Sequence, residues 1–172
     1  DAGARNFYTA GQPITCLEDM QGMHIRVQES EMMASMVEAL GAIAVQIGYG
    51  DVYSSLEKGV VDGAENNWPS YEAMQHCEVA QYYTIDEHTR VPEIQVCSKH
   101  TWDKISAEDQ QIIMECAKES AIYQRVLWTA QEEESEKLAI SGGAQIIRLP
   151  ATEKLKFQQA VEPLYEKYCG SY

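Results

Sequence analysis

The 172-residue sequence lacks the features that define several large protein classes. It has no run near the roughly 20 apolar residues that a membrane-spanning helix needs, and it starts without the basic and apolar stretches of a signal peptide. Positive charge is scarce, because 13 Lys and Arg stand against 27 Asp and Glu, a net charge of −14. Such a surface repels a nucleic-acid backbone or an anionic membrane, so we expect neither as a partner. The protein is either cytoplasmic or exported with its signal removed.

Motifs of metal, nucleotide and hydrolytic chemistry are missing as well. The five cysteines have no CxxC spacing, so we expect neither a disulfide framework nor a zinc site. The sequence contains no GxxxxGK[ST] loop, GxSxG elbow or HExxH helix, and Gly48-Tyr49-Gly50 lacks the third glycine of a dinucleotide fingerprint. The histidines stand at no chelating interval with carboxylates or thiols. We expect no metal, no cofactor and no catalytic residue, although a Cys–His pair that meets only in the fold stays open.

What is present is an alternation of strand and helix patterns. Residues 24–28 and 43–47 alternate like strands, and Ser30 precedes an amphipathic stretch that ends at Gly41, which is typical of a helix. Further predicted strands are residues 5–9, 82–85, 93–98 and 144–149. Further predicted helices are 15–22, with Thr15 as its N-cap, 51–58, and a helix from 152 with a break or kink at Pro163. This alternation is typical of a wound α/β sheet, in which polar side chains gather at one edge.

The longest predicted element is a helix over residues 106–141. Ser106 can cap it, and no Pro or Gly follows until Gly142. About 35 helical residues span about 50 Å at 1.5 Å each. This is more than one small compact domain needs, and a helix of this length usually bridges lobes or lies across the back of a molecule.

Arginine is rare, so its positions are informative. Arg26 lies inside a predicted strand between Ile25 and Val27, where a guanidinium needs an anion. Its planar fork suits a ligand carboxylate, but an ion pair with a carboxylate of the chain is an equally open interpretation. Arg5 is a second candidate, with a solvated terminal charge as its alternative.

Other candidates stand near predicted strand ends. Asn66 can both donate and accept hydrogen bonds, as hydroxyl or carboxylate recognition requires, and it lies with Glu65 and Trp68 in one polar and aromatic run. Tyr49 can lay its ring against a sugar, whereas a half-buried tyrosine with its hydroxyl in water is the alternative. His88 lies in a charged stretch that is more often a loop than a site.

Several of these stretches, in order, resemble TRAP-transporter substrate-binding proteins of the DctP type. Residues 17–27, LEDMQGMHIRV, are similar to the family's sleDlkGlKiRv segment. The runs YGDVY (49–53), GVVDGAEN (59–66), EVAQYY (78–83) and EH (87–88) follow at that family's intervals. The resemblance covers essentially the whole chain. It implies a periplasmic-binding-protein-like (type II-like) fold, in which two α/β lobes close around a ligand.

The resemblance also implies roles for individual residues. Arg26 matches the arginine that pairs with the substrate's carboxylate, and Arg5 matches a second family arginine. Tyr49 matches the aromatic that lies over the ligand, Asn66 the asparagine of the DGxEN segment, and His88 the histidine of the tdH stretch. The expected substrate-binding residues are Arg26, Arg5, Asn66, Tyr49, His88, Glu65, Gln28 and Trp68.

The sequence departs from the family pattern in ways that point to a branch. His24 replaces the usual lysine of KiRvP, and Gln28 replaces the proline. Together with GARNFY (3–8) and NNWPS (66–70), these differences look closer to the branch that binds hexuronates, such as glucuronate and galacturonate, than to the sialate or C4-dicarboxylate branches.

Family members begin well before the segment that matches Asp1, so this chain resembles a truncated C-terminal portion. Residues 1–90 and 130–172 would form the second lobe, and residues 91–129 would contribute to the first lobe, whose N-terminal part is absent. We therefore expect exposed apolar surface and self-association of this chain.

The resemblance implies a receptor that captures an organic acid, a hexuronate or a C4-dicarboxylate, and delivers it to TRAP membrane permease subunits. It would be periplasmic or extracytoplasmic, as a lipoprotein in a Gram-positive cell. Two alternatives stay open: an α/β enzyme that acts on an acidic sugar, and a module whose acidic face binds a basic protein.

Overall fold

The fold is built on one six-stranded mixed sheet in the computed structural model, which describes residues 2–170. The strands run in the order β3-β2-β4-β1-β5-β6. Their bounds are β1 Ala4–Thr9, β2 His24–Val27, β3 Ile43–Gln46, β4 Gly63–Asn66, β5 Tyr82–Arg90 and β6 Gln145–Arg148. Strand β2 is parallel to β3 and β4, and β5 is parallel to β6, while β1 is antiparallel to both of its neighbours. The predicted α/β class is confirmed.

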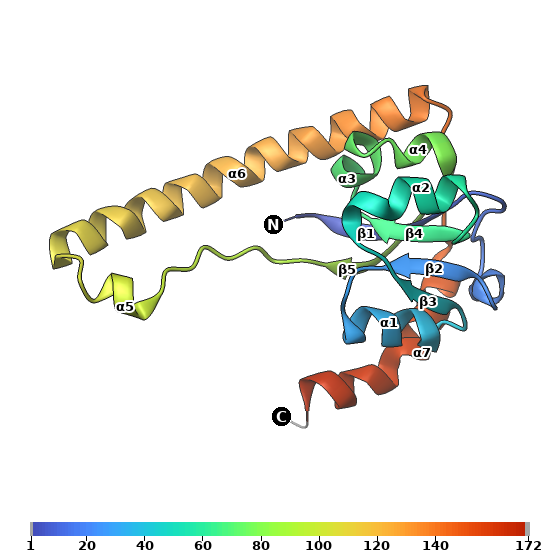
Figure 1. Ribbon diagram of the computed structural model, residues 1–172, viewed down its shortest axis with the longest axis horizontal. Coiled ribbons are helices and arrows are strands. Elements are labelled where there is room, and N and C mark those ends of the chain that lie inside the picture. The colour runs from blue at the N-terminus through green and yellow to red at the C-terminus, as the bar shows by residue number, and fades with distance from the viewer. Residues whose placement is uncertain (1, 171–172) are drawn as a thin grey trace.

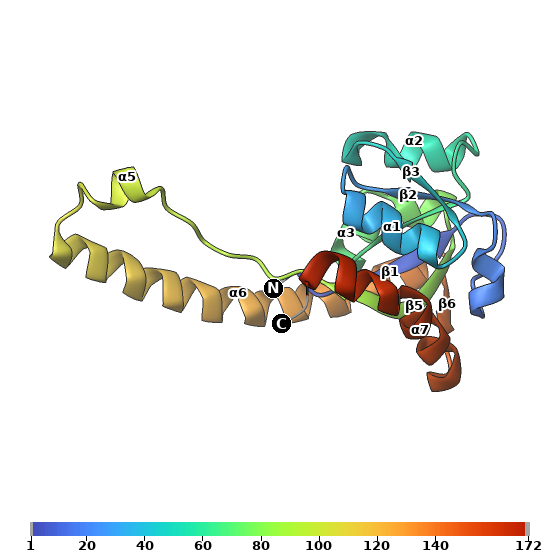
Figure 2. The ribbon, with the colours of Figure 1, turned by 90° about the horizontal axis from the view of Figure 1, so that it is seen from below.

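Helices cover both faces of this sheet (Figure 1). Helices α1 (Glu31–Ala39) and α7 (Ala151–Cys169) pack on one face. The opposite face carries α2 (Val52–Glu57), α3 (Trp68–Ala73), α4 (His76–Val79) and the last turns of α6 (Ala107–Ser141). In the view from below, α1 and α7 lie in front of the sheet (Figure 2). None of the described helices is both long and apolar enough to cross a membrane.

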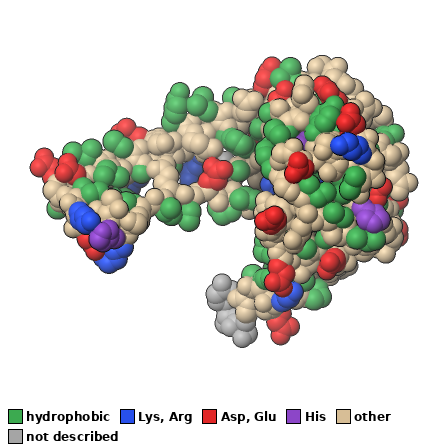
Figure 3. Space-filling view, in the orientation of Figure 1, with side chains coloured by type: hydrophobic (Ala, Val, Ile, Leu, Met, Phe, Trp, Pro, Cys, Tyr) green, Lys and Arg blue, Asp and Glu red, His purple; other side chains and the backbone are tan. Residues whose placement is uncertain are grey.

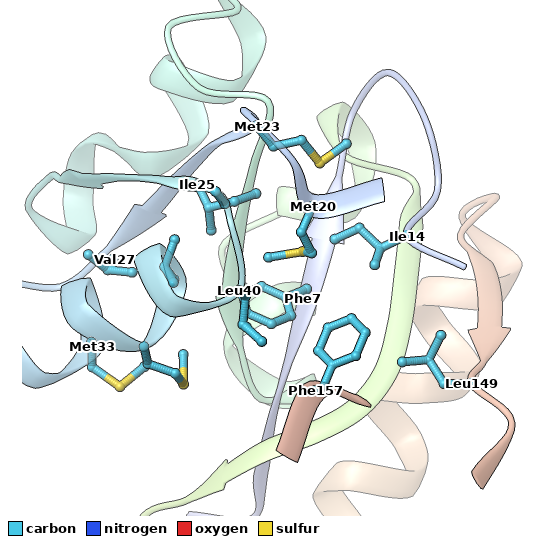
Figure 4. Packing of buried hydrophobic residues seen from close by; sticks show 13 residues of the cluster. Phe7, Ile14, Met20, Met23, Ile25, Val27, Met33, Leu40, Leu149 and Phe157 are labelled. Carbon is cyan, nitrogen blue, oxygen red and sulfur yellow. The ribbon is translucent and has the colours of Figure 1, made fainter. Parts of the chain in front are cut away.

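Two apolar clusters hold the layers together. Phe7, Ile25 and Leu40 lie between the sheet and α1, where Phe157 of α7 meets them (Figure 4). Tyr8 points to the other face and packs in the second cluster, under α2, α3 and α4. Neighbouring residues of β1 thus serve opposite cores, because successive side chains of a strand alternate between its faces.

The helix N-caps predicted from the sequence agree with the structure in one case and differ from it in another. The Ser30 hydroxyl accepts from the backbone N–H of Met33 and caps α1, as predicted. The helix predicted over residues 15–22 is shorter, a 3-10 turn over Leu17–Met20. Here the Asp19 carboxylate, instead of the Thr15 hydroxyl, accepts the bonds from the chain before the turn, because a charged acceptor is stronger. Of the break or kink predicted at Pro163, the break is wrong, since α7 continues through this residue.

Residues 91–128 form an arm that leaves the body of the molecule (Figure 1). The strand predicted over residues 93–98 is wrong, because this stretch is extended but pairs with no described strand. Ile94 and Val96 alternate as in a strand, yet each is 81% exposed. The far half of α6 displays further apolar side chains that are 43–67% exposed, namely Ile112, Ile113, Met114, Ile122, Tyr123, Val126 and Leu127. Apolar side chains lie scattered along the arm in Figure 3.

Candidate functional site

A cleft of about 550 Å³ opens where the arm meets the sheet. The carboxyl ends of β2, β3 and β4 and the first residues of β1 form its floor, and Val91 and Glu93 of the arm form a wall. In wound α/β sheets ligands bind at this edge. The structure brings five of the predicted site residues to this cleft, which are Arg5, Arg26, Gln28, Tyr49 and Asn66.

Arg26 is the distinctive charge of the cleft. Its side chain lies on the face of α2, α3 and α4, and the residue is only 3% exposed. The guanidinium Nε donates to the carbonyl oxygen of Ile47 at 2.8 Å, and no carboxylate of residues 2–170 forms an ion pair with it. Burial lowers the pKa of Arg26 from its ordinary value, and the tyrosines and Glu65 nearby offset this in part. A buried cation without an internal anion is unfavourable, so an external anion would stabilise it.

Arg5 reaches the cleft from the other face of the sheet and is neutralised within the protein. Its Nε and Nη2 donate to the Glu65 carboxylate at 2.5 and 2.8 Å, and Nη2 also donates to the Glu65 carbonyl at 3.0 Å. This bidentate pair is favourable because the two planar groups match. Burial lowers the pKa of Arg5, but the hydrogen bond and the charge of Glu65 raise it by more, so the pKa of Arg5 lies above its ordinary value.

His88 lies behind Glu65, away from the cleft. Its Nε2 is 3.4 Å from Glu65 and its Nδ1 is 2.6 Å from Asp86, while its ring stacks on Phe7 with 4.3 Å between centroids. Burial lowers its pKa, but the charges of Asp86 and Glu65 raise it more, to about 9. Burial likewise raises the pKa of Glu65, and the bonds from His88 and Arg5 bring it below its ordinary value. The result is a chain of alternating charges that holds Arg5 in place.

The remaining cleft groups are neutral or negative. Asn66 lines the cleft, and its Oδ1 accepts from the backbone N–H of Asn67 at 2.9 Å. Tyr49 is 44% exposed at the cleft, in a 3-10 turn between two glycines. Gln28 and Glu29 follow β2 at the same edge. These groups offer hydrogen bonds but no second unpaired cation.

Three predicted residues are not brought to the cleft lining. Glu65 and His88 stand behind Arg5, as described above. Trp68 stacks on Tyr83, with 3.7 Å between ring centroids, and lines a separate hollow beside α6. Their substrate contacts remain predictions.

Sequence reasoning missed four polar residues of the lining, which are Glu29, Asn67, Ser70 and Glu93. The Asn67 side chain accepts from the Ser70 N–H and caps α3, and its amide donates to the carbonyl of Ala2 at 2.9 Å. The signal was available, because an asparagine followed two residues later by proline is typical of a helix start. No group of three His, Cys, Asp or Glu side chains within the described part of the chain can hold a metal ion.

Comparison with known protein families identifies the family of this chain. The model of the family described as bacterial extracellular solute-binding protein, family 7 (DctP), matches residues 1–171. The chain belongs to this family. The predicted resemblance is confirmed.

Individual relatives support the assignment. A solute-binding protein of Chromohalobacter salexigens is 36% identical over 97% of this chain and 49% of its own length, and YiiZ of Salmonella typhimurium is 37% identical over 96% and 50%. The crystal structure of a TRAP periplasmic solute binding protein from Sulfitobacter sp. NAS-14.1 with bound β-D-galacturonate has a TM-score of 0.91 at 43% identity, over 98% of this chain and 55% of that one. This family 7 chain therefore spans about half the length of the curated relatives that it matches.

A second solved structure has the same fold and a related ligand. The TRAP periplasmic solute binding protein from Roseobacter denitrificans with bound β-D-glucuronate has a TM-score of 0.92 at 40% identity, over 98% of this chain and 55% of that one. Family membership thus rests on both sequence and fold.

Proposed function

We propose that the chain forms a large part of an extracytoplasmic receptor that captures a hexuronate, such as glucuronate or galacturonate, for a TRAP membrane permease. The observation that carries the proposal is Arg26, a buried cation in the cleft for which residues 2–170 supply no carboxylate. A ligand carboxylate supplies the missing anion, and a charge-assisted bond of this kind is strong when it is shielded from water. Periplasmic relatives of this family with bound hexuronates support the same ligand class.

The composition of the cleft favours one carboxylate over two. Arg5 is already paired with Glu65, so the cleft offers one unpaired guanidinium. Glu29 and Glu93 also line it and would repel a second carboxylate. The amides and hydroxyls that remain suit the hydroxyl groups of a sugar acid better than the far end of a C4-dicarboxylate.

The arm supports the proposed division into lobes. We infer that residues 1–90 and 130–172 belong to one lobe, and that residues 91–129 contribute to another. Nine large apolar side chains between Ile94 and Leu127 are at least 43% exposed, which is typical of a segment that another part of a protein covers. A second lobe that packs against the arm would cover them and would also complete the wall at Glu93.

Titration of the 172-residue chain with sugar acids, followed by NMR, tests the ligand. We expect saturable shifts with glucuronate or galacturonate, weaker shifts with succinate, and none with neutral glucose. Arg26→Ala should weaken uronate binding at least about 30-fold, the equivalent of about 2 kcal/mol, because it removes one partner of a shielded charge pair. Arg148→Ala is the matched control, since Arg148 is exposed and lies on β6, outside the cleft.

Each other result has a clear meaning. Unchanged affinity in the Arg26→Ala chain would remove Arg26 from the site, and equal binding of glucose would exclude charge recognition. Conversion of the uronate during the titration, visible as new sugar resonances, would favour the enzyme alternative over a receptor.

A further inference from the structure

A second polar group with an open bonding position lies on the same face of the sheet as Arg26. His76 is fully buried at the start of α4, directly after Gln75, whose backbone has the left-handed φ of 57°. Its Nδ1 lies 2.8 Å from the hydroxyl of Tyr8. Its Nε2 is buried and has no hydrogen-bond partner within residues 2–170. Most buried polar atoms are paired, so this exception needs an explanation.

The hydrogen bond to Tyr8 determines which nitrogen of His76 carries the proton. Burial raises the pKa of Tyr8 well above its ordinary value, so the phenol keeps its hydrogen. His76 Nδ1 is the acceptor found for this hydroxyl in the described part of the chain. The hydroxyl therefore donates to Nδ1, and the hydrogen of the neutral ring is on Nε2. The open position of His76 is a donor that needs an acceptor.

The pairing of β1 and β2 with β4 places this donor close to the cleft. Arg26 of β2 and Tyr8 of β1 both stand opposite Ala64 of β4, so the three side chains form one row on one face of the sheet. Only the methyl group of Ala64 separates the other two. His76 rests on Tyr8, and its ring meets the edge of Tyr49 with 6.4 Å between centroids. Arg26 and Tyr49 themselves line the cleft.

We propose that His76 is a further ligand-binding residue, whose Nε2–H donates, directly or through one water molecule, to an oxygen of the acid held at Arg26. The inference rests on the proposed function. Arg26 and the imidazole N–H are both donors, so the group that satisfies them together must be an acceptor, as a carboxylate or a hydroxyl oxygen is. Tyr49 contacts the His76 ring and also lines the cleft, so it lies beside the path between the two.

The charge state of His76 suits this role. Burial lowers its pKa to about 4, and the positive charge of Arg26 contributes in the same direction. Tyr8, which bonds to the ring, keeps its hydrogen, and Arg26 nearby is a cation, so neither of these neighbours favours a protonated imidazole. The imidazole therefore stays neutral, with one hydrogen available for the ligand.

Two substitutions of His76 distinguish the contribution of Nδ1 from that of Nε2. Asparagine in His76→Asn can keep the contact with Tyr8 but has no group at the position of Nε2, whereas the longer glutamine in His76→Gln can place an amide N–H there. We expect about a tenfold loss of glucuronate affinity for His76→Asn, and a loss within about threefold for His76→Gln. Tyr71→Phe is the control, since it removes another buried hydrogen bond, from Tyr71 to the carbonyl of Ala80, on the same face. It should leave affinity unchanged.

A measurement on the unaltered chain keeps the proposal testable if a variant does not fold. The ¹⁵N resonances of His76 should show the Nε2–H form, and Nε2 should shift when glucuronate is added but not when glucose is added. A chain that binds uronate with no shift at Nε2, or with equal affinity in His76→Asn, would overturn the inference and leave the proposed function intact. A chain that binds no uronate would refute the proposed function, and this inference with it.

Discussion

Glu65→Gln tests the buried charges behind the cleft most directly. The carboxylate of Glu65 is fully buried and accepts from Arg5 and from His88. Glutamine keeps the shape of this side chain but removes its charge. Arg5 would then have no carboxylate partner among the residues described, while His88 would keep its bond to Asp86 at 2.6 Å.

The expected loss follows from these contacts. Removal of one partner of a buried ion pair typically lowers the free energy of unfolding by about 3–5 kcal/mol. Arg5 keeps its bond to the Glu65 carbonyl, and its side chain is 11% exposed, so the lower end of the range applies. We expect a loss of about 3 kcal/mol at pH 7, which corresponds to a fall in Tm of roughly 6–12 °C for a chain of this size.

Urea unfolding followed by circular dichroism measures this change. Glu87→Gln is the matched control, because Glu87 is exposed and pairs with Lys154 and Arg90 at the surface, so its loss should stay below about 1 kcal/mol. Replacing both partners, as in Arg5→Met with Glu65→Leu, should recover much of the stability, since no unpaired charge remains. The reasoning is refuted if Glu65→Gln matches the control, or if the double variant is no more stable than the single one.

Three further results can be expected. His88 has a pKa of about 9, above its ordinary 6.5, so the stability that its protonation adds is complete below pH 6.5. This stability should fall by about 3 kcal/mol as the pH rises through 9. In pH-dependent melting curves, His88→Asn should remove this fall. A Cβ on Gly63 would lie 2.5 Å from the backbone oxygen of Tyr8, so Gly63→Ala should lower the free energy of urea unfolding by about 2 kcal/mol, whereas Gly11→Ala, with open space around it, should be nearly neutral. Light scattering should detect self-association that rises with concentration and weakens in Val126→Glu, because Val126 is 67% exposed on the arm; a monomer at all concentrations would contradict this.

Much of the fold could be predicted because its signals are local. The Ser30 cap, the alternation at residues 24–28 and the Ser106 cap each depend on a few neighbouring residues, and each marks an element that the structure contains. The stretch 93–98 failed for the opposite reason. Its alternation of apolar side chains is real, but a strand needs a neighbour, and residues 2–170 provide none for it.

The site was predicted only in part. Arg26 could be found from sequence because a charge inside an apolar strand is conspicuous. Whether it pairs with an internal acid depends on the register of β2 and β4, which the sequence leaves open. The partnership of Arg5 with Glu65 spans 60 positions and requires the antiparallel pairing of β1 with β4. His76 gave no signal at all, since its role arises from a row of side chains on three strands.

The arm begins and ends at almost the same place on the body. Arg90 and Thr129 line one hollow, so residues 91–128 form an excursion whose two ends meet. Replacing this excursion by a linker of about five residues would reduce the entropy of loop closure by about 2 kcal/mol, which favours the folded body. The sheet with its helices would then form a smaller protein without the exposed apolar side chains of the arm.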